Sequence, residues 1–123
     1  MEFIKKENII NMKNTGVTSK QIICPANSNS DKCTVTEVHL EPKAVQSRHA
    51  HEFSEQIWYA LKGKGKLLLA ENKEQIFSAG EAVRFEKNDI HGLYNDSDKE
   101  FVYISVTSPP IDFSYAYKDK GKS

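Results

Sequence analysis

The chain has 123 residues, and its 17 lysines and arginines balance its 17 aspartates and glutamates, so the formal net charge is zero. A chain of this length is expected to fold as one domain around one core. The balanced charge, with no basic stripe, argues against nucleic acid as the main partner, and no apolar run approaches the roughly 20 residues that span a membrane.

The N-terminal part of the sequence combines apolar strand-like residues with a polar loop. The first residues lack the basic-then-apolar pattern of a secretion signal, which predicts a cytoplasmic protein. In that compartment Cys24 and Cys33 are expected to be reduced. Residues 1–34 are expected to form N-terminal strands and a loop at an edge of the domain.

Short strands separated by turns fill the rest of the sequence, whereas helical periodicity is nearly absent. Turn signals recur every ~8–12 residues, which predicts an all-β sandwich or barrel. The alternating, β-branched segment at 34–40 places Val38 and Leu40 on the core side and turns His39 to the surface. Further strands are expected at residues 55–61, 67–70, 75–77, 81–86, 91–95 and 101–107.

Two consecutive prolines end the last of these strands, because proline cannot donate a hydrogen bond to a neighbouring strand. The proline pair is Pro109 and Pro110. Residues 108–123 are therefore expected to form a C-terminal extension, with a frayed tail at residues 118–123.

Two of the four histidines, His49 and His51, are separated by one residue. On an extended strand such side chains project from the same face, close enough to bind one ion. Neutral imidazole suits Mn, Fe, Ni, Co or Zn. A polar strand end exposed to solvent gives the same pattern, so the pair needs further support from the sequence.

That support comes from two segments that resemble the two sequence motifs of the cupin superfamily. Residues 49–63, HAHEFSEQIWYALKG, are similar to the first motif, and residues 80–95, GEAVRFEKNDIHGLYN, are similar to the second, with His91 at its histidine position. The resemblance covers residues 35–106. It implies a small single-domain metal-binding cupin, with a double-stranded β-helix or jelly-roll barrel as its core at residues 35–107.

The same resemblance implies one divalent metal ion per chain, bound by His49, His51, His91 and a fourth ligand. Counting back from Gly63 with the family's spacing gives Gln56. Strand parity from His51 would instead give Glu55, so Gln56 is the favoured ligand and Glu55 the alternative. A neutral glutamine would leave the site one charge unit more positive, which favours anionic ligands.

The second motif departs from the family pattern at three positions. Glu86 and Ile90 stand where prolines are common, and Asn88 stands where glycine is usual. Asparagine tolerates the left-handed conformation better than most residues, so the turn remains feasible.

The residues around the expected metal site indicate a half-apolar pocket for a small molecule. No catalytic acid or base is fixed by the spacing of the sequence. The residues expected to line the pocket are Phe53, Trp58, Leu93 and Tyr103.

Three functions remain open from the sequence. The first is a metal-dependent isomerase, lyase or dioxygenase acting on a small polar or anionic metabolite. The second is a non-catalytic sensor or binding module, and the third is a barrel with a structural metal ion. The resemblance also implies a homodimer, to which residues 4–23 could add a strand at a partner's sheet edge.

Overall fold

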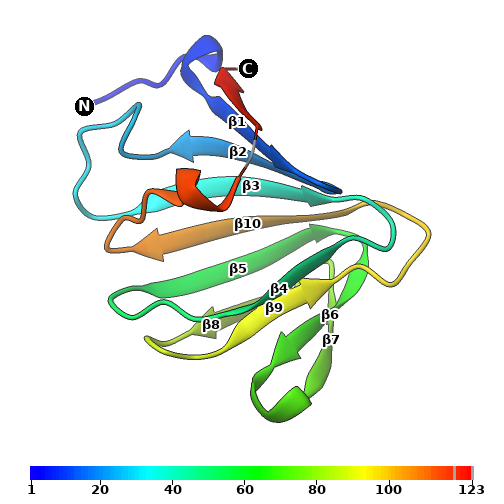
Figure 1. Cartoon of the computed structure of the whole chain (residues 1–123). Coiled ribbons are helices and arrows are strands. Elements are labelled where there is room, and N and C mark those ends of the chain that lie inside the picture. Colours follow the sequence, from blue (N-terminus) through cyan, green and yellow to red (C-terminus); the bar gives the residue numbers. More distant parts are fainter. Residues whose placement is uncertain (118, 123) are drawn as a thin grey trace.

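The computed structural model of the chain describes residues 1–117 and residues 119–122, the last four by their backbone alone. Two antiparallel sheets lie against each other and enclose the core (Figure 1). The larger sheet contains, in spatial order, β11 (Asp119–Lys122), β1 (Ile10–Asn14), β2 (Val17–Ile23), β3 (Thr34–Leu40), β10 (Phe101–Ser108), β5 (Glu55–Lys62) and β8 (Ala82–Phe85). The smaller contains β4 (Val45–His49), β9 (His91–Tyr94), β6 (Lys64–Leu69) and β7 (Glu74–Ser78).

Helical structure in the described residues is limited to short 3-10 turns. These are η1 (Lys6–Asn8), η2 (Ala70–Asn72) and η3 (Phe113–Ala116). None of the described helices has the length and apolar character needed to cross a membrane. The two-sheet arrangement confirms the predicted all-β jelly-roll fold.

Alternating burial along the strands of the larger sheet decides which side chains reach the core. In β5 the side chains of Gln56, Trp58 and Ala60 are buried, whereas their neighbours along the strand face solvent. The same alternation in β3 buries Val38 and Leu40, as predicted from the sequence. Period-2 alternation therefore positions one face of each strand against the smaller sheet. The core cluster consists of Val17, Val38, Leu40, Trp58, Ala60, Leu67, Phe77, Phe85, Leu93, Phe101 and Tyr103.

The turn before β9 has a left-handed residue at Asn88, the position where the second motif usually has glycine. Asn88 has a φ of 69°, in the left-handed region that asparagine tolerates. Its backbone N–H donates to the carbonyl of His51 at 2.8 Å. The turn in the second motif is thereby tied to the loop that carries the second histidine of the first motif.

The C-terminal end of the chain corrects one prediction. Residues 119–122 form β11, which pairs with β1 from Ile10 to Lys13, so the expected frayed tail is wrong for these four residues. Lys118 and Ser123 lie outside the described residues. The prediction relied on the polar, lysine-rich composition of this segment. Composition does not prevent its backbone from pairing with the open edge of β1.

The N-terminal strands belong to the chain's own larger sheet. β2 pairs with β3, and β1 pairs with β2 on one side and with β11 on the other. This strand edge is therefore covered within the chain rather than left for a partner. The homodimer stays a prediction. Both cysteines are free thiols, as expected.

Candidate metal centre

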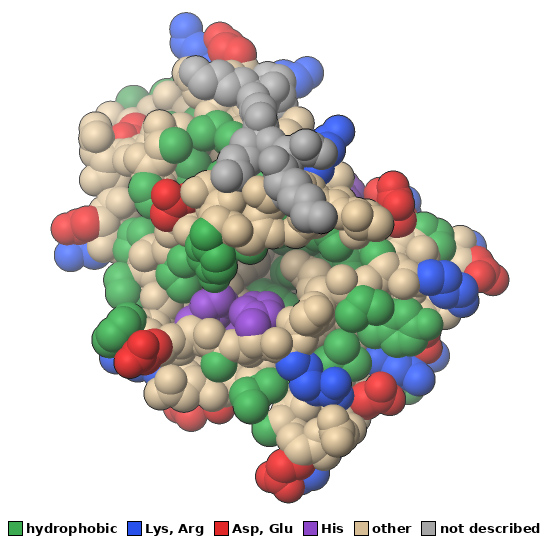
Figure 2. Space-filling view, viewed as in Figure 1, with side chains coloured by type: hydrophobic (Ala, Val, Ile, Leu, Met, Phe, Trp, Pro, Cys, Tyr) green, Lys and Arg blue, Asp and Glu red, His purple; other side chains and the backbone are tan. Residues whose placement is uncertain are grey.

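Three histidines from two segments of the chain meet in the structure. His49 ends β4, His51 follows it by two residues, and His91 begins β9 directly opposite His49 in the strand register. Their ring centroids are 4.4 to 5.2 Å apart, and their ligand atoms all lie within 4.8 Å of one another. Figure 2 shows histidine side chains in a hollow of the surface. His39 is not part of this cluster and faces outward, paired with Glu37 at 2.7 Å.

A glycine permits the close approach of the two strands that carry the histidines. A Cβ added to Gly92 would stand 2.6 Å from the Gln46 carbonyl oxygen and 3.0 Å from the Arg48 nitrogen. The β4–β9 register shifts between Gln46 and His49, beside this contact. The site therefore requires glycine at position 92, which motif spacing did not reveal. The position of Gly92 directly after His91 was the sequence feature that could have indicated it.

Backbone carbonyls hold two of the imidazoles in a single tautomer. Nδ1 of His49 donates to the Ser47 carbonyl, and Nδ1 of His91 donates to the Asp89 carbonyl, each at 2.8 Å. A neutral imidazole with its hydrogen on Nδ1 presents a bare lone pair at Nε2. The second nitrogen of a metal-binding histidine is commonly oriented in this way.

The Nε2 atom of His51 is buried and has no hydrogen-bond partner among the described residues. A buried polar atom without a partner is rare because it loses its hydration without compensation. A cation bound at this lone pair would satisfy it.

Gln56 lies beside the histidines and reaches them with its amide oxygen. Its Nε2 donates to the Thr107 hydroxyl at 2.9 Å, and its Oε1 accepts from the indole N–H of Trp58 at 3.1 Å. The same Oε1 lies 3.1 Å from Nε2 of His91. Because that nitrogen carries no hydrogen in the tautomer above, two lone pairs face each other. Two ligands of one ion, each ~2.1 Å from it and at right angles, would be about 3.0 Å apart.

Glu55, the alternative fourth ligand, lies on the other face of β5. Its carboxylate pairs with Arg84 at 3.0 Å, and about half of each side chain is exposed. The strand parity that favoured Glu55 does not hold because residues 50–54 interrupt the strand between His51 and β5. The described structure therefore brings Gln56, and not Glu55, to the histidines.

Burial keeps two of the histidines neutral. It lowers the pKa of His51 from 6.5 to about 4, with a smaller contribution from His49. Burial also lowers the pKa of His91 to about 4, although its bond to the Asp89 carbonyl opposes the shift. Both side chains are thus unprotonated near neutral pH, which is the form that binds a metal ion.

A cavity of about 510 Å³ adjoins the histidines and opens to solvent. Trp58 and Tyr103, which were expected to line a pocket, are among the residues that line it. Two other predicted pocket residues do not line it. Phe53 is 72% exposed, because the loop that carries it turns the ring to solvent. Leu93 shares the face of His91 on β9 but is fully buried in the core cluster, outside the cavity lining.

The cavity also has a wall that the sequence did not predict. It comes from the β1–β2 hairpin, β3 and the C-terminal segment at residues 113–117. Phe113 in this segment meets His51 edge-on, with ring centroids 5.9 Å apart. None of the described residues that line the cavity is an aspartate or a glutamate. The cavity-lining residues missed from the sequence include Ser19, Thr36, Gln46, Ser105, Phe113, Tyr115 and Tyr117.

Comparison with known proteins supports the fold over nearly the whole chain. The chain is similar to KdgF from a Halomonas species, with a TM-score of 0.75 and 23% identity over 91% of this chain and 96% of that one. It is also similar to the polyketide cyclase RemF from Streptomyces resistomycificus, with a TM-score of 0.76 and 17% identity over 99% and 84% of the two chains. A third similar structure is a sugar phosphate isomerase from Silicibacter pomeroyi, with a TM-score of 0.67 and 22% identity over 76% and 60%.

Sequence comparison identifies the family directly. No curated protein matches the chain significantly. The family model Cupin_2, described as the Cupin domain, matches residues 36–107, which is more than half of the chain and includes all three clustered histidines. The chain is therefore a single-domain member of the cupin family.

Proposed function

We propose that the protein binds one divalent metal ion through His49, His51, His91 and Gln56, and that this ion holds a small oxyanion- or carbonyl-bearing metabolite in the cavity. One observation carries the proposal. Imidazole lone pairs and one amide oxygen point toward one another, and no hydrogen lies between them to form a hydrogen bond. The nitrogen-rich ligand set suits Mn, Fe, Ni, Co or Zn.

The charge of the site supports an anionic or strongly polar ligand. All four metal ligands are neutral, and no carboxylate is among the described residues that line the cavity. The charge of a bound ion would therefore be left uncompensated by protein, and an oxyanion would be its natural partner. When bound, the ion would supply a Lewis acid that polarises a carbonyl or acidifies a bound water.

The residues of the chain would orient the ligand and keep water from part of the site. Trp58 fixes the oxygen of Gln56, and Phe113 covers His51 at the opening. Isomerase, lyase and dioxygenase chemistry are all compatible with this arrangement, as is a sensor that only binds. A purely structural metal is less well supported, because structural sites are closed by protein and this one adjoins a cavity.

Metal analysis of the purified protein, after reconstitution with each candidate ion, tests the first half of the proposal. We expect one ion per chain, and loss of that ion in the double variant His49→Ala/His51→Ala. The matched control is His39→Ala, which removes an imidazole from the outer face of β3. A double variant that retains one ion per chain with unchanged affinity would contradict the proposal.

Fluorescence tests the second half, because Trp58 is the single tryptophan of the chain and its ring centroid lies 5.4 Å from that of His91. Titration of the metal-loaded protein with small carboxylates should change the emission. The same titration after chelation of the metal should not. Equal binding with and without metal would show that the ion does not anchor the ligand.

A further inference from the structure

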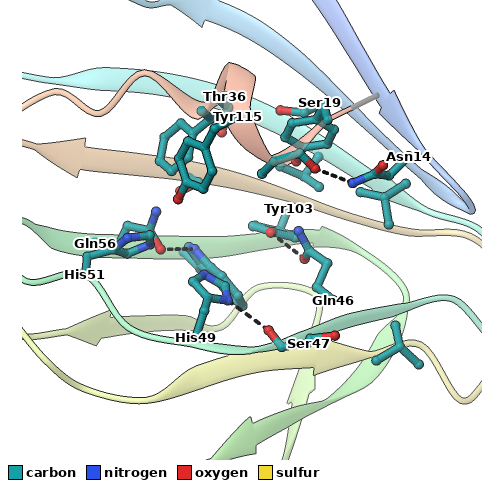
Figure 3. A pocket seen from close by; sticks show the side chains of 18 of the residues that line it. Asn14, Ser19, Thr36, Gln46, Ser47, His49, His51, Gln56, Tyr103 and Tyr115 are labelled. Carbon is teal, nitrogen blue, oxygen red and sulfur yellow. Dashed lines mark hydrogen bonds between the residues drawn. The ribbon is translucent and has the colours of Figure 1, made fainter. Parts of the chain in front are cut away.

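The cavity has a polar wall on the side away from the histidines. Figure 3 shows Ser19, Thr36 and Asn14 on that side, with His49, His51 and Gln56 across the cavity from them. Most of this wall comes from residues outside the matched cupin domain, which begins at residue 36. The subsite residues discussed below all lie outside the two motifs at residues 49–63 and 80–95.

Two hydroxyls in this wall have no hydrogen-bond partner among the described residues. Thr36 on β3 and Ser105 on β10 are directly opposite each other in the strand register. Thr36 is 3% exposed and Ser105 is 4% exposed, and both line the cavity. Neither oxygen is among the buried atoms left without a partner, because both hydroxyls face the open cavity. Adjacent hydroxyls that bond no other residue are free to bond a ligand held in the cavity.

A third hydroxyl, that of Tyr117, is held in the same wall by hydrogen bonds. Nε2 of Gln21 donates to the Ser19 hydroxyl at 2.6 Å. Ser19 in turn bonds the phenol of Tyr117. This bond holds the Tyr117 phenol at the wall, where the side chain lines the cavity.

The segment that carries Tyr117 is held at several points. Asp112 accepts from the backbone of Ser114 at 3.0 Å, the Asn14 amide donates to the Ala116 carbonyl, and β11 pairs with β1. The wall is therefore built from anchored segments and not from a free end of the chain.

Strand geometry gives the distance between this wall and the metal ligands. Gln56 pairs with Thr107, and Ser105 precedes Thr107 by two residues on β10. Using about 3.3 Å per residue and about 4.8 Å between strands, the backbone of Ser105 is about 8 Å from that of Gln56, and Thr36 is about 12 Å away. A two-carbon acid bound at the metal would be too short to reach either hydroxyl.

We propose that Thr36, Ser105 and Tyr117 form a second subsite that binds the hydroxyl-bearing end of an extended, polyhydroxylated acid whose carboxylate end lies at the metal. This subsite rests on the proposed function, since the metal holds the other end of the ligand. The ligand class follows from the wall itself, which offers neutral hydroxyls and aromatic rings but no charge of either sign.

Calorimetric titration of the Zn²⁺-loaded protein with three carboxylates tests the subsite. Glycolate reports on the metal end alone, gluconate adds a chain of hydroxyls, and hexanoate adds chain length without hydroxyls. Gluconate is expected to bind roughly tenfold more tightly than the other two. In Thr36→Val/Ser105→Ala the affinity for gluconate should fall to that for glycolate, while the affinity for glycolate stays unchanged. Tyr117→Phe should give a partial loss.

Two further measurements separate a binding role from a structural one. Removing hydroxyls that bond no other residue should leave the melting temperature nearly unchanged, whereas removing bonded ones would lower it. The control Thr18→Val changes the same residue type on the outer face of β2, outside the cavity lining. It should leave all three affinities unchanged.

The outcomes distinguish the two proposals. If none of the three compounds binds the Zn²⁺-loaded protein, the proposed function fails and the subsite fails with it. If glycolate binds but gluconate binds no more tightly, or the double variant keeps the preference for gluconate, the subsite alone is overturned. Hexanoate binding as tightly as gluconate would also overturn it, because the wall would then recognise length and not hydroxyls.

Discussion

The two walls of the cavity differ in how close together their residues lie in the sequence. The wall with the histidines comes from β4, β5 and β9, and its proposed ligands stand at fixed spacings in two short motifs. The opposite wall combines the β1–β2 hairpin, β3, β10 and residues 113–117, which are brought together only in the folded chain. The first wall carries the three clustered histidines, whereas the second carries the hydroxyls of the proposed subsite.

The largest expected effect comes from a residue that binds nothing. Gly92→Ala would place a methyl group 2.6 Å from the Gln46 carbonyl, so β4 must move away from β9. We expect a loss of about 1–3 kcal/mol in the free energy of unfolding, together with weaker metal binding. Denaturant titration and metal competition measure the two effects.

Gly65→Ala is the matched control for this substitution. Its added Cβ would lie 3.1 Å from the Tyr94 carbonyl, in the same small sheet but away from the β4–β9 contact. It should lower stability without altering metal affinity. Equal metal affinity in Gly92→Ala and the wild type would show that the close approach of the strands is not needed to place His49.

The second prediction compares the two neighbours on β5. Gln56→Ala should weaken metal binding about tenfold or more, since it removes the oxygen beside His91. Glu55→Ala should change it little, because that carboxylate pairs with Arg84 on the outer face. Competition with a chelator of known affinity measures both. Small and equal effects would indicate a site formed by the three histidines alone.

The clustering of the three histidines was predictable because they lie in short segments with characteristic spacing. His49, His51 and His91 were identified from sequence, and Gln56 was favoured over Glu55 by its spacing to Gly63. The fold was predictable for a similar reason, since period-2 alternation at 34–40 and 55–61 reports which face is buried. These patterns are local, so they can be recognised in the sequence without the tertiary structure.

The opposite wall could not be predicted because no local pattern marks it. Thr36 and Ser105 alternate along their strands like any inward-facing residue, and only the β3–β10 register places them side by side. Phe53 was misplaced for the complementary reason. It neighbours the ligands in sequence, but the loop between β4 and β5 directs its ring to solvent.

The third prediction concerns acid stability of the metal-free protein. Burial lowers the pKa of His51 and His91 to about 4, whereas the unfolded chain titrates near 6.5. Between these values the unfolded state binds more protons than the folded state, so stability should fall as the pH drops from about 6.5 to about 4 and level off below. Urea midpoints of chelator-treated protein measure this dependence.

A variant assigns this slope to the histidines. His51→Ala/His91→Ala should flatten the profile in the same range, because it removes both groups from the folded and unfolded states alike. Carboxylates that titrate near pH 4 will remain in both proteins and cancel in the comparison. Identical slopes in the two proteins would place the acid sensitivity elsewhere in the chain.

The smallest expected effect separates two phenylalanines that lie near the site for different reasons. Phe113 covers His51 from the C-terminal segment, with ring centroids 5.9 Å apart, whereas Phe53 is 72% exposed. Burial is the main cause of the lowered pKa of His51, so Phe113→Ala should admit water and raise that pKa toward 6.5 in the metal-free protein. Phe53→Ala should leave it unchanged, although Phe53 is only two residues from His51. Histidine titration followed by NMR measures the shift in each variant. An equal shift in both would mean that proximity in sequence governs the environment of His51, and no shift in Phe113→Ala would mean that the C-terminal segment does not shield the metal ligands.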